Sequence, residues 1–269
     1  MDTVKQNGER ISQEQRQTIS MRYKRVTRAV NSEFWGSDSE TVHSRYVGSY
    51  GRGTAINTSD IDILVELPRQ EYERYDSLRG NGQSRLLQAV KNAILNTYPR
   101  SDVHADGQVI VANFSDGMKF EILPAFKQTD RFGNWNGKYD YADTNMGGNW
   151  RSTNPKAEQD AMAKKNRETN GLLYDTCKHM REIRDNHFSS YHLSGIVIDS
   201  YVYHHMADWH WLREGETSSN QPVGTYEKKL SSECPIITFS LYAPGSWDVI
   251  DTSNSVNGLF KVLNYMSKE

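Results

Sequence analysis

The segment 46–68, YVGSYGRGTAINTSDIDILVELP, constrains this chain more than any other part of it. It holds three closely spaced glycines, Gly48, Gly51 and Gly53. Because glycine has no Cβ, such a turn is tight and its backbone can approach a ligand closely. Ser49 adds a hydroxyl among exposed backbone amides, which suits phosphate oxygens. The apolar run 60–67, stopped by Pro68, is typical of a strand. The segment therefore predicts a phosphate-binding turn followed by a strand.

Two carboxylates lie at the start of that strand. Asp60 and Asp62 are two positions apart, so both project from one face. At about 6.6 Å and an effective dielectric near 20, their repulsion costs about 2–3 kcal/mol. A structural role does not require this cost, and a divalent cation removes it. A pair of this kind is common by itself, so the interpretation depends on what accompanies it.

Glu121 is the carboxylate that accompanies them. It lies in the second of two strand-like runs, 108–114 and 118–123, which Ser115, Asp116 and Gly117 separate as a hairpin turn would. In this strand Glu121 faces opposite to its neighbours Phe120 and Ile122. If the strand lies beside 60–67, three carboxylates converge. The alternative is a Glu121 that is merely solvated.

Three converging carboxylates suit a two-metal site. In such sites, ions about 3.5–4 Å apart activate an attacking hydroxyl and stabilise a leaving pyrophosphate. The combination of glycine turn, paired aspartates and the later acid favours this interpretation over a polar surface strand. Asp60, Asp62 and Glu121 are therefore the predicted catalytic and metal-binding residues.

The remaining pattern predicts an α/β (α+β) protein with a mixed sheet. Ser12 and Gln15 form a capping box ahead of a long amphipathic helix that Gly36 ends. Further helices are expected at 84–97, 155–186, 190–212 and 254–267, and a short strand at 44–47. Residues 128–154 lack periodicity and are expected to form a long ordered loop. The chain is thus predicted to consist of a catalytic part, 1–154, and a helical part, 155–269, with a cleft between them.

The motifs GSYGRGTAINTSDIDILV and FEILPAF resemble the nucleotidyltransferase superfamily of DNA polymerase β. Within it the chain is most similar to the bacterial cyclic-oligonucleotide synthases related to cyclic GMP–AMP synthase, the CD-NTases. The similarity extends from about residue 12 to the C-terminus. The segment 138–158 resembles their linker into the helical lobe, and 177–200 resembles their nucleotide-contacting helices.

The resemblance implies roles for individual residues. Gly48 and Ser49 match positions that hold the donor triphosphate. Lys178 matches a lysine that grips the same phosphates, Ser190 a serine that contacts them, and Tyr191 an aromatic residue that stacks on a base. Many relatives have Asp where this chain has Glu121, and the longer side chain alters the geometry available to a general base.

Each of the last three residues also has a structural interpretation. Ser190 can cap a helix that begins near His192. Lys178 can be one solvated residue of a basic helix face that includes Arg181 and Arg184. Tyr191 can be an aromatic residue packed at a helix start.

Two other groups of residues are candidates for a zinc site and for a base-binding site. The histidines His204, His205 and His210 lack the four-residue spacing of a helical zinc pair. An aromatic cluster in the loop 128–154 can hold a base or cover surface between the lobes, and covering surface is favoured. Its members are Trp135, Tyr139, Tyr141 and Trp150.

Composition excludes several classes of protein. The 32 basic and 34 acidic residues give a net charge of −2, without the basic excess of proteins held on duplex DNA by phosphate contacts. The two cysteines, Cys177 and Cys234, cannot form a disulfide framework or a four-thiolate zinc site. No apolar run approaches the roughly 18 residues of a membrane span, and the N-terminus lacks the apolar core of a signal peptide, so a cytosolic protein is expected.

The resemblance implies an enzyme that joins NTPs, ATP among them, into a cyclic di- or trinucleotide messenger of anti-phage defence. It implies two Mg²⁺ ions, which Mn²⁺ can replace, a regulatory protein partner and a downstream effector. The near-neutral charge argues against obligatory activation by DNA. Two alternatives stay open: a nucleotidyltransferase that modifies an antibiotic, a tRNA end or a protein, and a catalytically silent nucleotide-binding module.

Overall fold

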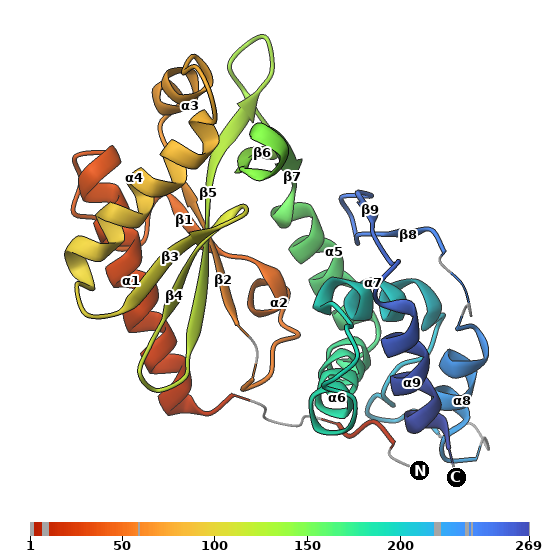
Figure 1. Cartoon of the computed structure of the whole chain (residues 1–269). Coiled ribbons are helices and arrows are strands. Elements are labelled where there is room, and N and C mark those ends of the chain that lie inside the picture. The colour runs from red at the N-terminus through yellow and green to blue at the C-terminus, as the bar shows by residue number, and fades with distance from the viewer. Residues whose placement is uncertain are drawn as a thin grey trace. The chain divides into compact units, whose positions relative to one another are not determined.

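The computed structural model describes residues 3–6, 11–58, 60–217, 222–234, 237 and 239–268 (Figure 1). These residues form two compact units. The sheet unit contains 12–51 and 60–155, and the helical unit contains 3–6, Ile11, 52–58 and 156–268. The segment 52–58, which directly follows the glycine turn, thus groups with the helical unit.

The sheet unit is a seven-stranded mixed sheet with helices. Its helices are α1 (Gln13–Phe34), α2 (Gly48–Gly51), α3 (Arg69–Asp76) and α4 (Gly82–Thr97), with a 3₁₀ turn η1 (Asn145–Gly147). Its strands are β1 (Ser44–Tyr46), β2 (Ile61–Glu66), β3 (Asp102–Asp106), β4 (Val109–Asn113), β5 (Lys119–Thr129), β6 (Trp135–Asp143) and β7 (Asn149–Thr153). The order is β1-β2-β5-β4-β3, with β6 on β5 and β7 on β6. Only β2 and β5 pair in parallel. The predicted fold class is confirmed.

Helices α1 and α4 lie side by side against the sheet (Figure 1). The predicted capping box of α1 is present, since Ser12 Oγ accepts from the Gln15 N–H and Gln15 Oε1 accepts from the Ser12 N–H. Gly36 follows the helix with φ +59°. The inward residues of α4 are as the period predicts: Leu86, Leu87, Val90 and Ile94 are each at most 1% exposed.

The hairpin predicted at 115–117 joins β4 to β5, with the Phe114 N–H donating to Met118 O. By contrast, the loop predicted over 128–154 is wrong. This segment completes β5 and forms the antiparallel pair β6–β7. Strand β6 alternates aromatic residues (Trp135, Tyr139 and Tyr141) with polar ones, so the period of two is present in the sequence. Strand β7 is short and polar and lacks such a pattern. Helix α3 and strand β3 were not predicted.

The helical unit contains α5 (Pro155–Glu168), α6 (Leu172–His187), α7 (Gly195–His205), α8 (Thr225–Ser232) and α9 (Val256–Ser267), with a small hairpin of β8 (Leu241–Tyr242) and β9 (Val249–Ile250). The single helix predicted over 155–186 is two helices, because Asn170 and Gly171 adopt positive φ between them. The helix predicted over 190–212 is shorter, and α8 was not predicted. Every helix in the described parts of the chain is too short or too polar to cross a bilayer.

Candidate active site

The predicted carboxylates meet where β2 and β5 run side by side. The two strands pair in parallel with Asp62 opposite Glu121. On either side of that pair, Ile61, Phe120 and Ile122 are at most 2% exposed. The apolar residues therefore fix the register, and the same alternation turns the carboxylates to the other face of the sheet. Asp60, one residue before β2, is 47% exposed at its side chain.

The glycine turn lies directly against Asp62. Gly48 opens α2 with φ +57°, and a Cβ built on it would lie 1.8 Å from Asp62 Oδ2. The Val47 N–H donates to Asp62 O at 2.9 Å, which holds the turn on the strand. Position 48 thus requires glycine both for its backbone conformation and for its closeness to the carboxylate. Ser49 is half-buried in the same turn.

Lys119 is a site residue that the sequence interpretation missed. Its Nζ donates to Asp60 Oδ2 at 3.0 Å and to Glu121 Oε1 at 2.6 Å. Burial disfavours the charged lysine, but the hydrogen bonds and charges of Glu121 and Asp60 outweigh it and raise the pKa of Lys119. The sequence contained the signal, because Lys119 stands two positions before Glu121 on a strand and so shares its face.

The donor set fits a divalent cation in its chemistry, since carboxylate oxygens are the ligands that Mg²⁺ prefers. Asp60 and Glu121 already share one cationic group, the Lys119 ammonium. Within the described residues, however, no three His, Cys, Asp or Glu side chains are grouped so that they hold one ion as they stand. Binding of a metal therefore requires the side chains around Lys119 to rearrange.

The other predicted nucleotide contacts belong to the helical unit. Lys178 is half-buried on α6. Ser190 is exposed in the turn between α6 and α7, and it is not a helix cap because α7 begins at Gly195 after Ser194. Tyr191 is 40% exposed in the same turn, and the Lys261 ammonium lies 4.5 Å above its ring. A serine and an accessible aromatic ring are thus adjacent on the surface of this unit.

A buried ionic network anchors the segment that follows the glycine turn. Asp199 on α7, which is fully buried, accepts from Arg52 Nε at 2.9 Å, from Arg181 Nη1 at 2.7 Å and from Thr54 Oγ1 at 2.9 Å. Arg52 also donates to Glu158 on α5 at 3.0 Å. Desolvation acts to raise the pKa of Asp199, but the two arginines outweigh it and lower the pKa. Charged residues of α5, α6 and α7 therefore hold the segment 52–58. Loss of one partner would leave a buried charge unpaired, which destabilises the folded state.

Comparisons with known proteins decide the family. The model of the Second Messenger Oligonucleotide or Dinucleotide Synthetase domain, SMODS, matches residues 2–166, more than half of the 269 residues. The chain belongs to this family. It is a nucleotidyltransferase that synthesises cyclic oligonucleotides, and the similarity to bacterial CD-NTases seen in its motifs is confirmed.

Solved structures agree with the SMODS assignment at the level of fold. The Elizabethkingia meningoseptica CdnE cyclic dinucleotide synthase matches with a TM-score of 0.60 and 15% identity, over 94% of this chain and 92% of that one. The Rhodothermus marinus CdnE c-UMP-AMP synthase matches with 0.62 and 13%, over 96% and 91%. The Vibrio cholerae DncV cyclic AMP-GMP synthase matches with 0.58 and 14%, over 83% and 60%. No curated protein matches the sequence.

The three histidines and two residues of the aromatic cluster have structural contacts in the SMODS chain. Each histidine weighed for zinc contacts a separate acceptor: Tyr242 O for His204, Glu233 for His205, and Asp208 O and Glu216 for His210. Of the aromatic cluster, Tyr139 is fully buried, and Trp150 stacks near Tyr72 with ring centroids 4.4 Å apart. These contacts support a packing role for Tyr139 and Trp150.

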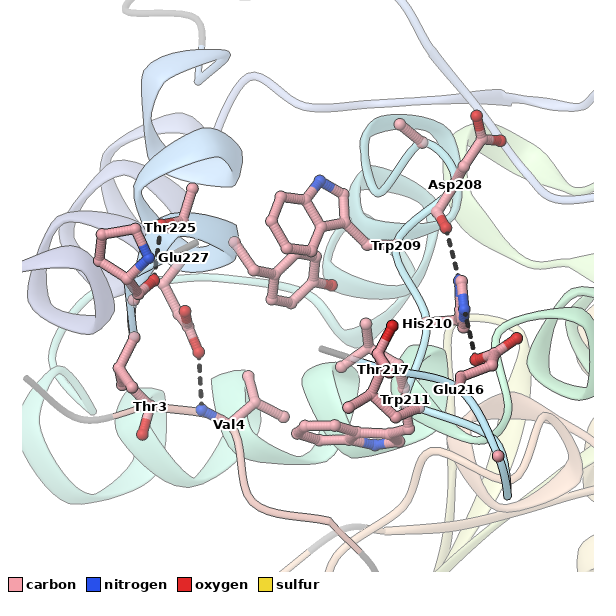
Figure 2. Close-up of a pocket in the computed structure, with 18 residues that line it drawn as sticks. Thr3, Val4, Asp208, Trp209, His210, Trp211, Glu216, Thr217, Thr225 and Glu227 are labelled. Atoms are coloured by element: carbon pink, nitrogen blue, oxygen red, sulfur yellow. Dashed lines mark hydrogen bonds and ion pairs between the residues drawn. The ribbon is translucent and has the colours of Figure 1, made fainter. Parts of the chain in front are cut away.

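The helical unit of the synthetase also contains a pocket of about 1010 Å³ (Figure 2). Its aromatic walls come from Trp209, Trp211 and Tyr226, and its carboxylates are Asp208, Glu216 and Glu227. Glu227 accepts from the Val4 N–H at 3.0 Å, which holds the N-terminal segment at the pocket edge. The described lining residues include no Lys or Arg. This acidic lining disfavours a triphosphate, so the pocket is not assigned to the nucleotidyl transfer.

Proposed function

We propose that Asp60, Asp62 and Glu121 hold two Mg²⁺ ions, which Mn²⁺ can replace, and that nucleotidyl transfer takes place there. One observation carries the proposal: Asp62 and Glu121 are paired in register, with the Gly48 turn directly on Asp62. When bound, such ions activate the attacking hydroxyl and stabilise the leaving pyrophosphate. The residues themselves fix where the reacting groups meet, because β2 and β5 are rigid neighbours in the sheet.

The glycine turn supplies the donor side of the reaction. Gly48 brings the backbone close to Asp62, and Ser49 follows it within the short helix α2. We assign both to the donor triphosphate. Backbone amides and a hydroxyl suit phosphate oxygens, and the place beside a carboxylate puts those phosphates next to the metal ligands.

Three residues of the helical unit are assigned to nucleotide binding. Lys178 provides a positive charge for the triphosphate, Ser190 a hydroxyl for the same phosphates, and Tyr191 a ring for a base. The exposure of Tyr191 and Ser190 supports these roles, because both side chains are accessible to a ligand. Ser190 does not cap a helix, because α7 begins at Gly195, five residues after it.

The product is a cyclic di- or trinucleotide made from NTPs, with ATP among the substrates. A ribose hydroxyl of one NTP attacks the α-phosphate of another, one phosphodiester forms and one pyrophosphate leaves. The linear intermediate retains a triphosphate and a free ribose hydroxyl. Bound again with these ends exchanged, it closes through the same carboxylates and releases a second pyrophosphate. The DncV structure carries a linear intermediate, 5′ pppA(3′,5′)pG, which supports a stepwise route in that relative.

The biological role proposed is second-messenger signalling in anti-phage defence, with a regulatory protein partner and an effector that binds the product. No DNA activator is required. The net charge of −2 supports this point, because activation on duplex DNA relies on many phosphate contacts.

Product analysis tests the proposal. Each labelled NTP, alone and in pairs, is incubated with the protein and Mg²⁺ or Mn²⁺, treated with phosphatase and analysed by mass spectrometry. A phosphatase-resistant cyclic product from NTPs alone is expected, and Asp62→Asn serves as the inactive control. Linear products only, or turnover only after DNA is added, would overturn the cyclic, DNA-independent reaction. Label transferred to a separate acceptor would support the alternative transferase.

A further inference from the structure

Lys119 occupies the middle of the proposed metal site. It is the first residue of β5, and extension of the β2–β5 register places it across from Asp60. Its ammonium lies 3.0 Å from Asp60 Oδ2 and 2.6 Å from Glu121 Oε1. One side chain of this protein thus links two of the three carboxylates that a metal would require.

The ion-pair partners of Lys119 are Asp60 and Glu121, and the other charged groups nearby are engaged elsewhere. Its antiparallel neighbour on β4 is the neutral Asn113. The nearby hairpin acid, Asp116, is paired instead with Arg22 at 3.0 Å. The other lysine of this strand, Lys127, pairs with Glu66 at 3.0 Å, at the far end of β2. Lys119 is therefore the lysine of β5 whose ammonium bridges two of the proposed metal ligands, whereas Lys127 pairs with a single glutamate away from them.

The side chain also has a route out of the site. Lys119 is 34% exposed, and Asp60 and Glu121 are 47% and 30% exposed at their side chains. A lysine ammonium sits on a flexible four-carbon stem and is readily hydrated. Lys119 can therefore leave the carboxylates for solvent without any movement of the sheet.

We propose that Lys119 is a positioning residue that competes with divalent cations for Asp60 and Glu121. Without metal, its ammonium balances the charge of the carboxylates and keeps them converged. When a metal ion binds, the ammonium is displaced. The ion pairs with Lys119 lower the affinity of Asp60 and Glu121 for metal. In return, they stabilise the ends of β2 and β5 when no metal is bound. The inference rests on the proposed function, because it takes these carboxylates as the metal ligands.

Metal binding without nucleotide tests the competition directly. Mn²⁺ affinity is measured by isothermal titration calorimetry and by the loss of the free-ion signal in electron paramagnetic resonance. Lys119→Met is expected to bind Mn²⁺ about five- to twentyfold more tightly than the wild type, which corresponds to about 1–1.8 kcal/mol for the two ion pairs together. Lys119→Gln should behave in the same way, and Lys119→Arg should stay close to the wild type.

Lys127→Met is the matched control, since it removes a lysine from the same strand that pairs away from the site. It should leave Mn²⁺ affinity unchanged. A second readout is thermal unfolding: Lys119→Met should unfold at a lower temperature than the wild type in EDTA, and Mn²⁺ should narrow that difference. Equal or weaker Mn²⁺ binding by both Lys119→Met and Lys119→Gln overturns the proposal.

Asp62→Asn separates this inference from the proposed function. If Asp62→Asn abolishes Mn²⁺ binding while the Lys119 variants bind as the wild type does, the metal site stands and the competition is wrong. If Asp62→Asn binds Mn²⁺ like the wild type, the metal assignment itself is wrong.

Discussion

Substitution of Gly48 by alanine tests whether the glycine turn positions Asp62. The added Cβ would lie 1.8 Å from Asp62 Oδ2, 2.4 Å from its Cγ and 2.7 Å from its Cβ, whereas ordinary contact begins near 3.4 Å. The strand cannot easily retreat, because the Asp62 carbonyl is held by the Val47 N–H and the next residue, Ile63, is fully buried. The Asp62 side chain must therefore rotate away from the position it now occupies.

Gly36→Ala is a matched control in the same unit. Gly36 has φ +59°, close to the +57° of Gly48, but nothing lies within 4 Å of its added Cβ. Both variants therefore carry the same backbone strain, about 1–2 kcal/mol for an L-residue in this region. For a protein of this size each kcal/mol lowers the unfolding temperature by about 2–4 °C. Any difference in activity between the two variants reports on Asp62.

The assay is pyrophosphate release under steady state, with thermal unfolding measured on the same samples. Gly48→Ala should lose about a hundredfold in kcat, since a catalytic group misplaced by about 1 Å can cost that much. Gly36→Ala should keep nearly all of its activity and lose only the stability due to strain. Comparable activity in the two variants would refute the argument that Asp62 must stay in contact with the turn.

Substitutions at five further positions test the remaining assignments. Asp60→Asn and Asp62→Asn should each remove nearly all activity in a pyrophosphate assay while leaving the fold intact; substantial turnover in either contradicts the metal assignment. Glu121→Gln should be inactive and Glu121→Asp partly active, and a normal rate for Glu121→Ala would place the third ligand elsewhere. Lys178→Ala should weaken NTP affinity while changing the free energy of unfolding by only a few tenths of a kcal/mol, about that of a surface residue; unchanged affinity supports the solvated interpretation. Asp199→Ala should lower the free energy of unfolding by about 3–5 kcal/mol in chemical denaturation, because it leaves Arg181 buried without its carboxylate and Arg52 paired with Glu158 alone; a loss near zero would contradict the ionic network.

Elements with strong local signals were predictable from the sequence. The capping box at Ser12 and the apolar stripe of α1 are contained within one segment, so no distant residue is needed to read them. Strand β2 has buried residues on both faces, which is visible in the sequence as the three consecutive apolar residues Ile63, Leu64 and Val65. Local patterns of this kind gave the helices α1 and α4 and the strands that hold the carboxylates.

The elements that were missed pair or pack with elements next to them in the chain, so their absence from the prediction reflects their local patterns. Strand β6 forms because the second half of β5 offers an edge at Ala125–Thr129, and β7 then pairs with β6. Strand β6 packs an aromatic face of Trp135, Tyr139 and Tyr141 on the sheet, whereas the short and polar β7 is defined by its backbone ladder to β6. Helix α3 buries only Tyr75 and is otherwise polar, so it too lacks an apolar stripe.

The candidate site shows why a sequence can name catalytic residues without giving their geometry. Asp62 and Glu121 come from strands that are separated by α3, α4, β3 and β4, and nothing local states that they pair. Their pairing is set by Phe120 and Ile122, whose burial allows one register only. A shift of one residue would turn Glu121 into the core and expose Phe120. The same alternation places Lys119 on the face of the carboxylates, so the packing of β5 determines where both Glu121 and Lys119 lie.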